Sequence, residues 1–162
     1  MKWNHFLLCL LVLAGISSCE KDDICVASDS AYLNITFYSA ESPEVAKSVT
    51  NFSLKELNGS IIGSFESTTV ASIALMLPVD DTEYSVIFEQ QVEENERTKT
   101  LRDTVVFSYT PKATFTSRAC GFIRTYEDLS ASREGSTGWV SEVRVLQSSV
   151  TNTSDEHVAI YH

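Results

Sequence analysis

The stretch NFSLKELNGSIIGSFE, residues 51–66, decides the fold class of this chain. Apolar and polar residues alternate on both sides of Asn58-Gly59, which is the period of a β-strand with one buried face. Asn-Gly is the strongest short signal for a β-hairpin, because both residues tolerate a positive φ. We therefore expect strands over residues 51–57 and 60–66, joined by a tight turn at Asn58-Gly59.

The same alternation recurs along the rest of the chain. Short runs rich in Val, Ile, Thr, Tyr and Phe are separated by polar turns such as PVDDTE and REGST, and no run keeps a 3.6-residue period. Further strands are expected over residues 32–39, 71–78, 83–91, 97–109, 114–126, 138–147 and 157–161. This pattern predicts an all-β fold, an antiparallel β-sandwich that is immunoglobulin-like or similar, with eight or nine strands.

Residues 1–18 have the composition of a signal peptide rather than of a folded segment. Lys2 supplies a positive charge, and an apolar run too short to cross a bilayer follows it. The run ends in Ile16-Ser17-Ser18-Cys19, which resembles a bacterial lipobox, and two or more acyl chains such as palmitate on Cys19 would anchor the protein stably. The alternative is an ordinary secretory signal. We predict a lipoprotein signal peptide over 1–18, a lipidated tether over 19–30 and a single domain over 31–162.

The tether carries a second signal directly after the lipid site. Lys21, Asp22 and Asp23 resemble the short Lys-acid-acid export signal that sends lipoproteins of Bacteroidota to the outer leaflet. We therefore expect a lipid-anchored protein of the outer membrane, displayed on the cell surface. A merely solvated tether, with the domain on the periplasmic face, is the alternative.

The charge of the chain narrows the range of partners. Removing residues 1–18 takes away Lys2 and no acid, so 11 Lys and Arg face 22 Asp and Glu, for a formal charge of −11. That balance disfavours nucleic acid, whose recognition needs a basic footprint. It also disfavours a partner made of anionic lipid. The 144 residues that remain suit one domain with its own core.

Two cysteines remain once Cys9 leaves with the signal and Cys19 carries lipid. Cys25 and Cys120 most simply pair with each other, because an exported protein meets an oxidising compartment. A metal or redox site is the alternative, although the chain contains no C-x-x-C. In the chain-entropy model, a crosslink over this span stabilises the fold by about 4–5 kcal/mol at most.

Several segments carry a family resemblance. They are the lipobox followed by EKDDIC, the ITFY strand, LMLPVDDTEYSVIF, VFSYTPKATFTSRACGF and the terminal HVAIY, of which SRACGF is the most specific. Through them the chain resembles, end to end after the signal, a family of small Bacteroidota lipoproteins of unknown function. The resemblance implies the anchor, the β fold and the Cys25–Cys120 disulfide, and it supplies no catalytic residues.

Motifs for catalysis, cofactors and metals do not occur in the sequence. There is no G-x-S-x-G, no Walker loop and no H-E-x-x-H, and the acidic pairs fall in predicted turns without the register of a calcium loop. His157 and His162 are expected to face solvent. We predict no catalytic residue, no cofactor and no metal, and a protein that is not an enzyme.

Two sets of side chains leave alternatives open. Arg118, Arg124, Arg133 and Arg144 either form a patch for an anionic ligand or pair with acids across strands. Six aromatic side chains either line a sugar-binding platform or pack in the core. They are Tyr32, Tyr38, Tyr109, Tyr126, Tyr161 and Trp139.

Short matches to glycosylation signals also occur. Asp29-Ser30-Ala31 and Asp103-Thr104-Val105 resemble the O-glycosylation sequon of exported Bacteroidota proteins, which makes Ser30 and Thr104 candidate sites. Four N-x-S/T sites would matter only in a eukaryotic secretory route. They begin at Asn34, Asn51, Asn58 and Asn152.

These observations predict a lipid-anchored envelope or surface protein that acts as a non-catalytic binding or accessory module. Its partners would be the membrane, through the anchor, and an envelope protein or glycan, but not nucleic acid. Two alternatives are a carbohydrate-active enzyme with an unrecognised site and a secreted disulfide-bonded glycoprotein.

Overall fold

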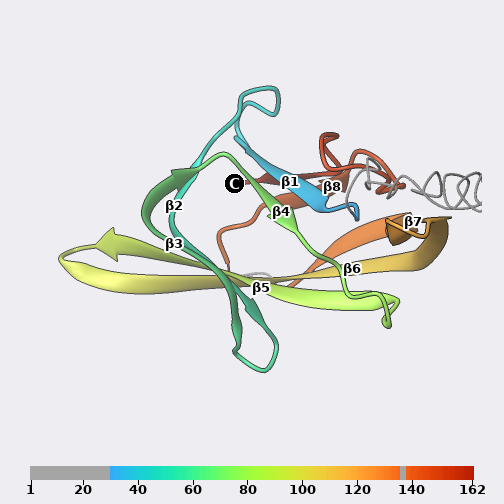
Figure 1. Ribbon diagram of the computed structural model, residues 1–162. Helices are drawn as coiled ribbons and strands as arrows, with labels where there is room; N and C mark the ends of the chain where they lie inside the picture. Colours follow the sequence, from blue (N-terminus) through green and yellow to red (C-terminus); the bar gives the residue numbers. More distant parts are fainter. Residues whose placement is uncertain (1–29, 136–137) are drawn as a thin grey trace, which may run out of the picture.

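A computed structural model describes residues 30–135 and 138–162, and its architecture is shown in Figure 1. These residues form nine strands and no helix, which confirms the all-β prediction. The strands are β1 (Leu33–Tyr38), β2 (Val49–Glu56), β3 (Ile61–Val70), β4 (Ser72–Leu75), β5 (Glu83–Glu94), β6 (Arg97–Ser117), β7 (Gly121–Glu134), β8 (Glu142–Val145) and β9 (Val158–Tyr161).

The strands form two sheets that pack as a sandwich. One sheet has the order β4-β1-β9-β8, and the other has the order β3-β2-β5-β6-β7. All neighbouring strands are antiparallel except β1 and β9, which pair in parallel from Ile35↔Val158 to Tyr38↔Tyr161. The predicted sandwich and strand number are confirmed. The parallel pair joins segments from opposite ends of the domain, which only a long connection allows.

The core lies between the two sheets, and β1 contributes alternate residues to it. Leu33, Ile35 and Phe37 of β1 are fully buried, and they belong to one apolar cluster with Phe88 of β5 and Phe107 of β6. Burying a side chain of this size contributes about 1.5–3 kcal/mol. The period-2 pattern of the sequence therefore identifies the inner face of β1, whereas all four residues of β9 are buried.

The turn between β2 and β3 forms where Asn58-Gly59 predicts it, but with different geometry. Gly59 has a φ of +88°, whereas Asn58 has no positive φ. The Gly59 N–H donates to Glu56 O at 2.9 Å, and the Asn58 side chain accepts the Ser60 N–H at 2.7 Å. The Asn58 side chain thus holds the turn through a hydrogen bond rather than through a left-handed backbone.

The three longest strands, β5, β6 and β7, form two further hairpins, and the sequence pattern predicts only one of their two turns. Residues 114–126 read as one run, but the chain turns in their middle, between the end of β6 at Ser117 and the start of β7 at Gly121. The β5–β6 and β6–β7 turns therefore lie at opposite ends of β6 (Figure 1). Gly121 has a φ of +68°, which suits the sharp reversal there.

Candidate binding surface

The residues predicted for anchoring and export lie outside the described part of the chain. Cys19, Lys21, Asp22, Asp23 and Cys25 all precede Ser30, where the described residues begin. Lipidation, export and the disulfide therefore stay predictions. Within the described residues, no helix is long and apolar enough to cross a membrane.

Cys120 lies in the β6–β7 turn, where its N–H donates to the Ser117 hydroxyl at 3.0 Å. The first described residues lie near that turn, because the Ala31 N–H donates to Arg124 O of β7 at 3.0 Å. Ala31 therefore lies beside β7, the strand that follows Cys120.

The two candidate O-glycosylation residues differ in their surroundings. Ser30 is half-buried at the start of the described chain. Thr104 is also half-buried and lies in the middle of β6, opposite Glu134 of β7 and Ile87 of β5. Its neighbour Asp103, which the sequon requires, is buried on the inner face. Glycosylation at both residues stays a prediction.

The expectation that both histidines face solvent is wrong. His157 is fully buried, and its Nδ1 accepts the Asn34 N–H at 3.1 Å. His162 is half-buried against Trp139, with ring centroids 5.2 Å apart, and its Nε2 lies 2.9 Å from Lys47 O. Burial lowers the pKa of both imidazoles below the ordinary value of 6.5. The last strand lies inside its sheet, so the end of the sequence is not an edge of the fold.

The aromatic side chains follow the core interpretation rather than the sugar-platform interpretation. Tyr109, Tyr126 and Tyr161 are buried. The Tyr126 hydroxyl donates to Leu77 O at 2.7 Å, and the Tyr109 hydroxyl donates to Pro78 O at 2.9 Å, so both tether the segment after β4. Burial raises the pKa of Tyr126. Three further members of the set are half-buried, namely Tyr32, Tyr38 and Trp139.

The four arginines do not gather into one patch. Arg133 pairs with Asp103 of the neighbouring strand, as the cross-strand interpretation predicts. Arg144 instead pairs with Glu142 of its own strand at 2.9 Å and stacks over the Tyr161 ring. Arg118 and Arg124 are exposed and have no ion pair among the described residues.

Asp103 forms a buried junction that the sequence analysis did not identify. One carboxylate oxygen, Oδ2, accepts the backbone N–H groups of Trp139 at 2.6 Å and Val140 at 2.8 Å, while Oδ1 lies 3.2 Å from Arg133 Nη1. Arg133 also donates to Val140 O. A Cβ on Gly138 would lie 1.9 Å from Asp103 Oδ2, so the carboxylate occupies the space that a side chain would need. The junction fixes the segment before β8.

A second buried carboxylate lies on the outer face of the larger sheet. Glu89 of β5 contacts Lys55 at 2.7 Å and Arg102 at 2.6 Å, one from each neighbouring strand. The hydrogen bond from Lys55, joined by that from Arg102, lowers the pKa of Glu89 despite its burial. Both buried carboxylates thus hold the fold together. Among the described residues, no group of three or more His, Cys, Asp or Glu could hold a metal ion.

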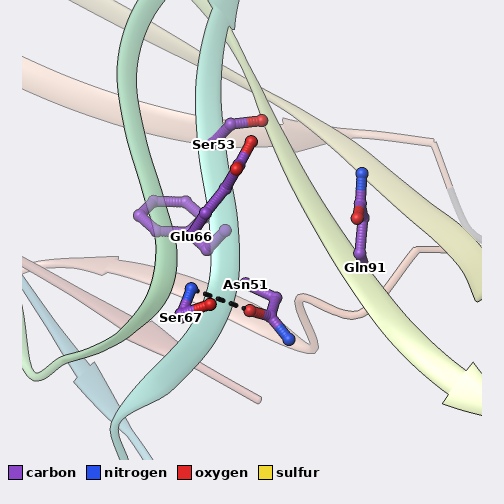
Figure 2. Close-up of a pocket in the computed structure, with 6 residues that line it drawn as sticks. Asn51, Ser53, Glu66, Ser67 and Gln91 are labelled. Atoms are coloured by element: carbon purple, nitrogen blue, oxygen red, sulfur yellow. Dashed lines mark hydrogen bonds between the residues drawn. The ribbon is translucent and has the colours of Figure 1, made fainter.

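A polar hollow of about 220 Å³ lies on the outer face of the larger sheet, where β2 and β3 bulge (Figure 2). Asn51 and Ser67 both have a positive φ, and the Ser67 N–H donates to Asn51 Oδ1 at 3.0 Å. Figure 2 shows Ser53 and Glu66 beside each other above this bond, with Gln91 across from them on β5. This hydrogen bond joins the two bulged residues, so the bulges stabilise the β2–β3 pair.

An apolar groove of about 430 Å³ runs between β3 and β4, which are edge strands of the two sheets. Ile62 and Met76 are 41% and 59% exposed at its rim. Further apolar lining comes from Tyr32, Leu54, Phe65, Ile73 and Leu75. Both flanking strands have a neighbour on one side only, so one edge of each is unpaired with another strand.

The comparisons with known proteins assign a family but no activity. No curated protein and no solved structure matches this chain. A family of unknown function (DUF6452) matches residues 49–162, which include every strand from β2 to β9. The sequence analysis predicted a family of unknown function, and its link to lipoproteins of Bacteroidota stays a prediction. The chain therefore belongs to the family of unknown function DUF6452.

Proposed function

We propose that this protein is a lipid-anchored, non-catalytic binding module of the cell envelope, held in the outer membrane by Cys19 and displayed on the cell surface. Its ligand in this proposal is an extended, apolar segment of a partner protein. The observation that carries the proposal is the groove between β3 and β4, where exposed apolar side chains lie between two edge strands.

The edge strands favour a polypeptide over other ligands. An extended peptide that joins a sheet edge gains backbone hydrogen bonds, and its alternate side chains enter the neighbouring apolar groove. Edge strands in stable proteins are normally short, charged or covered. β3 instead has ten residues and exposes Ile61 and Ile62 near its start. Met76 adds a flexible side chain that adapts to different partners.

The core aromatics weigh against a glycan ligand. Stacking on a sugar needs an exposed ring face, and Tyr109, Tyr126 and Tyr161 are buried. The hydroxyl and ring contacts of Tyr109 and Tyr126 are internal to the sandwich, and the Tyr161 ring lies under Arg144. Of the two ligand classes that the sequence analysis left open, a protein segment therefore fits the described surface better.

The start of the described chain supports both the tether and the disulfide. Ala31 is hydrogen bonded to Arg124 at 3.0 Å. The four residues from Arg124 back to Cys120 span about 13 Å of strand, and the six residues from Ala31 back to Cys25 can span about 20 Å. Cys25 can therefore reach Cys120 without any rearrangement of the sandwich. The tether would then leave the domain at the β6–β7 turn.

Site-specific photo-crosslinking tests the groove. We would place the crosslinker at Met76 in one strain and at Leu57, which is 66% exposed outside the groove, in a matched control. The proposal expects a defined envelope adduct from Met76 alone, and loss of that adduct when Ile62→Glu is added. Identical adducts from both positions, or an adduct indifferent to Ile62→Glu, would contradict it.

A separate measurement tests the anchor. Cys19→Ala should move the protein from the membrane fraction to the soluble fraction, because the acyl chains are lost. Retention of this variant in the membrane after a salt wash would contradict lipidation at Cys19. Replacing Lys21, Asp22 and Asp23 together should keep the lipid but hide the domain from protease added to intact cells.

A further inference from the structure

The charge of the chain is distributed unevenly, and one stretch of two neighbouring strands is free of acids. From Thr104 to Tyr126 there is no Asp or Glu, although the chain after the signal carries a formal charge of −11. The same stretch contains Lys112, Arg118 and Arg124. The stretch covers most of β6, the β6–β7 turn and the first half of β7.

Two phenylalanines are exposed at this same end. Phe115 and Phe122 face each other across the β6–β7 pair, with ring centroids 5.5 Å apart. They are 57% and 64% exposed, so the pair packs against itself and not into the core. Exposed large aromatic side chains on a protein surface usually mark a site of interaction with another body.

The cations beside this pair are available to a ligand. Arg118 in the turn and Arg124 next to Phe122 are exposed, and neither has an ion pair among the described residues. Lys112 is paired with Glu127, which lies beyond the acid-free stretch. The β6–β7 tip, residues 112–124, therefore combines two unpaired guanidinium groups with two exposed aromatic rings.

The chain also enters the domain beside this tip. The Ala31 N–H is bonded to Arg124 O, so the segment leading back to Cys19 begins at β7. Twelve residue steps separate Cys19 from Ala31, which limits that segment to about 40 Å when fully extended. If Cys25 is bonded to Cys120, only six steps, about 20 Å, separate the lipid from the tip.

We propose that the β6–β7 tip docks on the bilayer surface, with Arg118 and Arg124 on lipid phosphate groups and the Phe115–Phe122 pair in the interface. Guanidinium groups form paired hydrogen bonds with phosphate, and phenylalanine rings on an apolar face enter the boundary between headgroups and acyl chains. The whole-chain charge argues against an anionic lipid surface, and the tether adds four acids against Lys21. The field near a surface depends on the charges within about one Debye length, 8–10 Å, and on the tip itself these are the two exposed guanidinium groups.

Docking at this tip gives the domain a defined orientation. The β5–β6 turn lies at the opposite end of β6 (Figure 1), where Glu93 and Glu94 end β5 and Glu96 lies in the turn before Arg97. Residues 93–99 hold three acids and two cations, with Lys99 paired to Glu94, so this end has a formal charge of −1 and an anionic surface attracts the tip more strongly. The inference rests on the proposed anchor only for the distance between the lipidated Cys19 and the tip. The tip itself lies within the described residues.

Vesicle co-sedimentation of the chain from Cys19 onward, made without lipid, tests the inference apart from the anchor. This form retains every residue that the structure describes. We expect it to bind vesicles of phosphatidylglycerol and phosphatidylcholine more tightly than vesicles of phosphatidylcholine alone, and to dissociate as salt is raised. Each arginine replaced by glutamine, at 118 or 124, should weaken binding about fivefold.

A matched pair of double variants separates the tip from exposed apolar surface in general. Phe115→Ser with Phe122→Ser should abolish sedimentation, whereas Leu57→Ser with Ile61→Ser, at residues 66% and 65% exposed on the β2–β3 hairpin, should leave it unchanged. All four residues are exposed, so both proteins should keep the thermal midpoint of the parent.

Three outcomes would overturn the inference. They are no sedimentation of the parent chain with either vesicle, equal loss in both double variants, and capture of a protein by the tip without any lipid binding. Failure here leaves the Met76 crosslink and the release by Cys19→Ala untouched, so it is distinguishable from failure of the proposed function.

Discussion

Replacing Gly138 with alanine tests the buried junction around Asp103. The φ of Gly138 is outside the left-handed region, so alanine brings no backbone strain. Its only penalty is contact, because the added Cβ would lie 1.9 Å from Asp103 Oδ2 and 2.1 Å from Asp103 Cγ. The carboxylate cannot simply turn aside, since Trp139, Val140 and Arg133 all bind it.

The size of the effect follows from what the displaced carboxylate loses. Two backbone N–H groups would lose their acceptor, and the side chain of Arg133, which is 22% exposed, would lose its partner. Hydrogen bonds to a charged group contribute about 1.5–3 kcal/mol each, and breaking a buried ion pair costs about 3–5 kcal/mol. The two figures count the same Asp103 carboxylate and are not added together. We therefore expect Gly138→Ala to lower the free energy of unfolding by about 3–5 kcal/mol.

Urea denaturation of four proteins gives the decisive comparison. These are the parent, Gly138→Ala, Asp103→Ala and the double variant. Once Asp103 is alanine, the space beside Gly138 is empty, so adding Gly138→Ala should cost less than about 1 kcal/mol. A Gly138→Ala protein within about 0.5 kcal/mol of the parent, or one equally destabilised in both backgrounds, would refute the reasoning.

Three further predictions concern buried polar groups. The folded pKa of His157 is below 6.5, so the unfolded chain binds more protons, and stability should fall as pH drops through 6.5. His157→Gln should reduce the slope of the unfolding free energy between about pH 5 and 7, and the slope that remains comes from His162, whose pKa is also lowered. The pKa of Glu89 is also lowered, so its contribution to the free energy of unfolding is present above its unfolded pKa and is lost as pH falls below about 4.5. Glu89→Gln should lower the free energy of unfolding by about 1 kcal/mol at pH 7 and remove the part of the acid slope that Glu89 causes. An unchanged slope would show that Lys55 does not hold the carboxylate. Tyr126→Phe leaves Leu77 O without its buried donor and should lower the thermal midpoint by the equivalent of about 1–2 kcal/mol, whereas no shift in calorimetry would mean that water replaces the hydroxyl.

The local sequence pattern was sufficient to predict where most strands lie and that the fold is all-β. The alternation in NFSLKEL marks Phe52 and Leu54 of β2 as inward-facing, because successive side chains of a strand point to opposite faces, whereas the apolar residues at the start of β3 stay exposed. The reversal at Gly59 was equally readable, since few residues other than glycine adopt a φ of +88°. The turn before Gly121 was missed, because aromatic and β-branched residues continue on both sides of it.

The candidate surfaces depended on which distant segments meet. Nothing near residue 62 in the sequence indicates that β3 lies beside β4 across the sandwich edge, or that Ile62 and Met76 share a groove. The charge of the β6–β7 tip could have been predicted from the sequence by counting charges in short windows, since residues 104–126 contain no acid. Its two phenylalanines could not be called exposed until the hairpin was known to leave the core.

The sequence by itself determined the strand pattern, most of the turns, the net charge and the prediction of an anchor at Cys19. These are local properties, set by side-chain alternation and by residues that tolerate particular backbone angles. The tertiary structure alone decided that β9 lies between β1 and β8, which buries His157, and that Gly138 meets Asp103. Such pairings join residues far apart in the chain, and they are selected by the burial of the whole core rather than by any one segment.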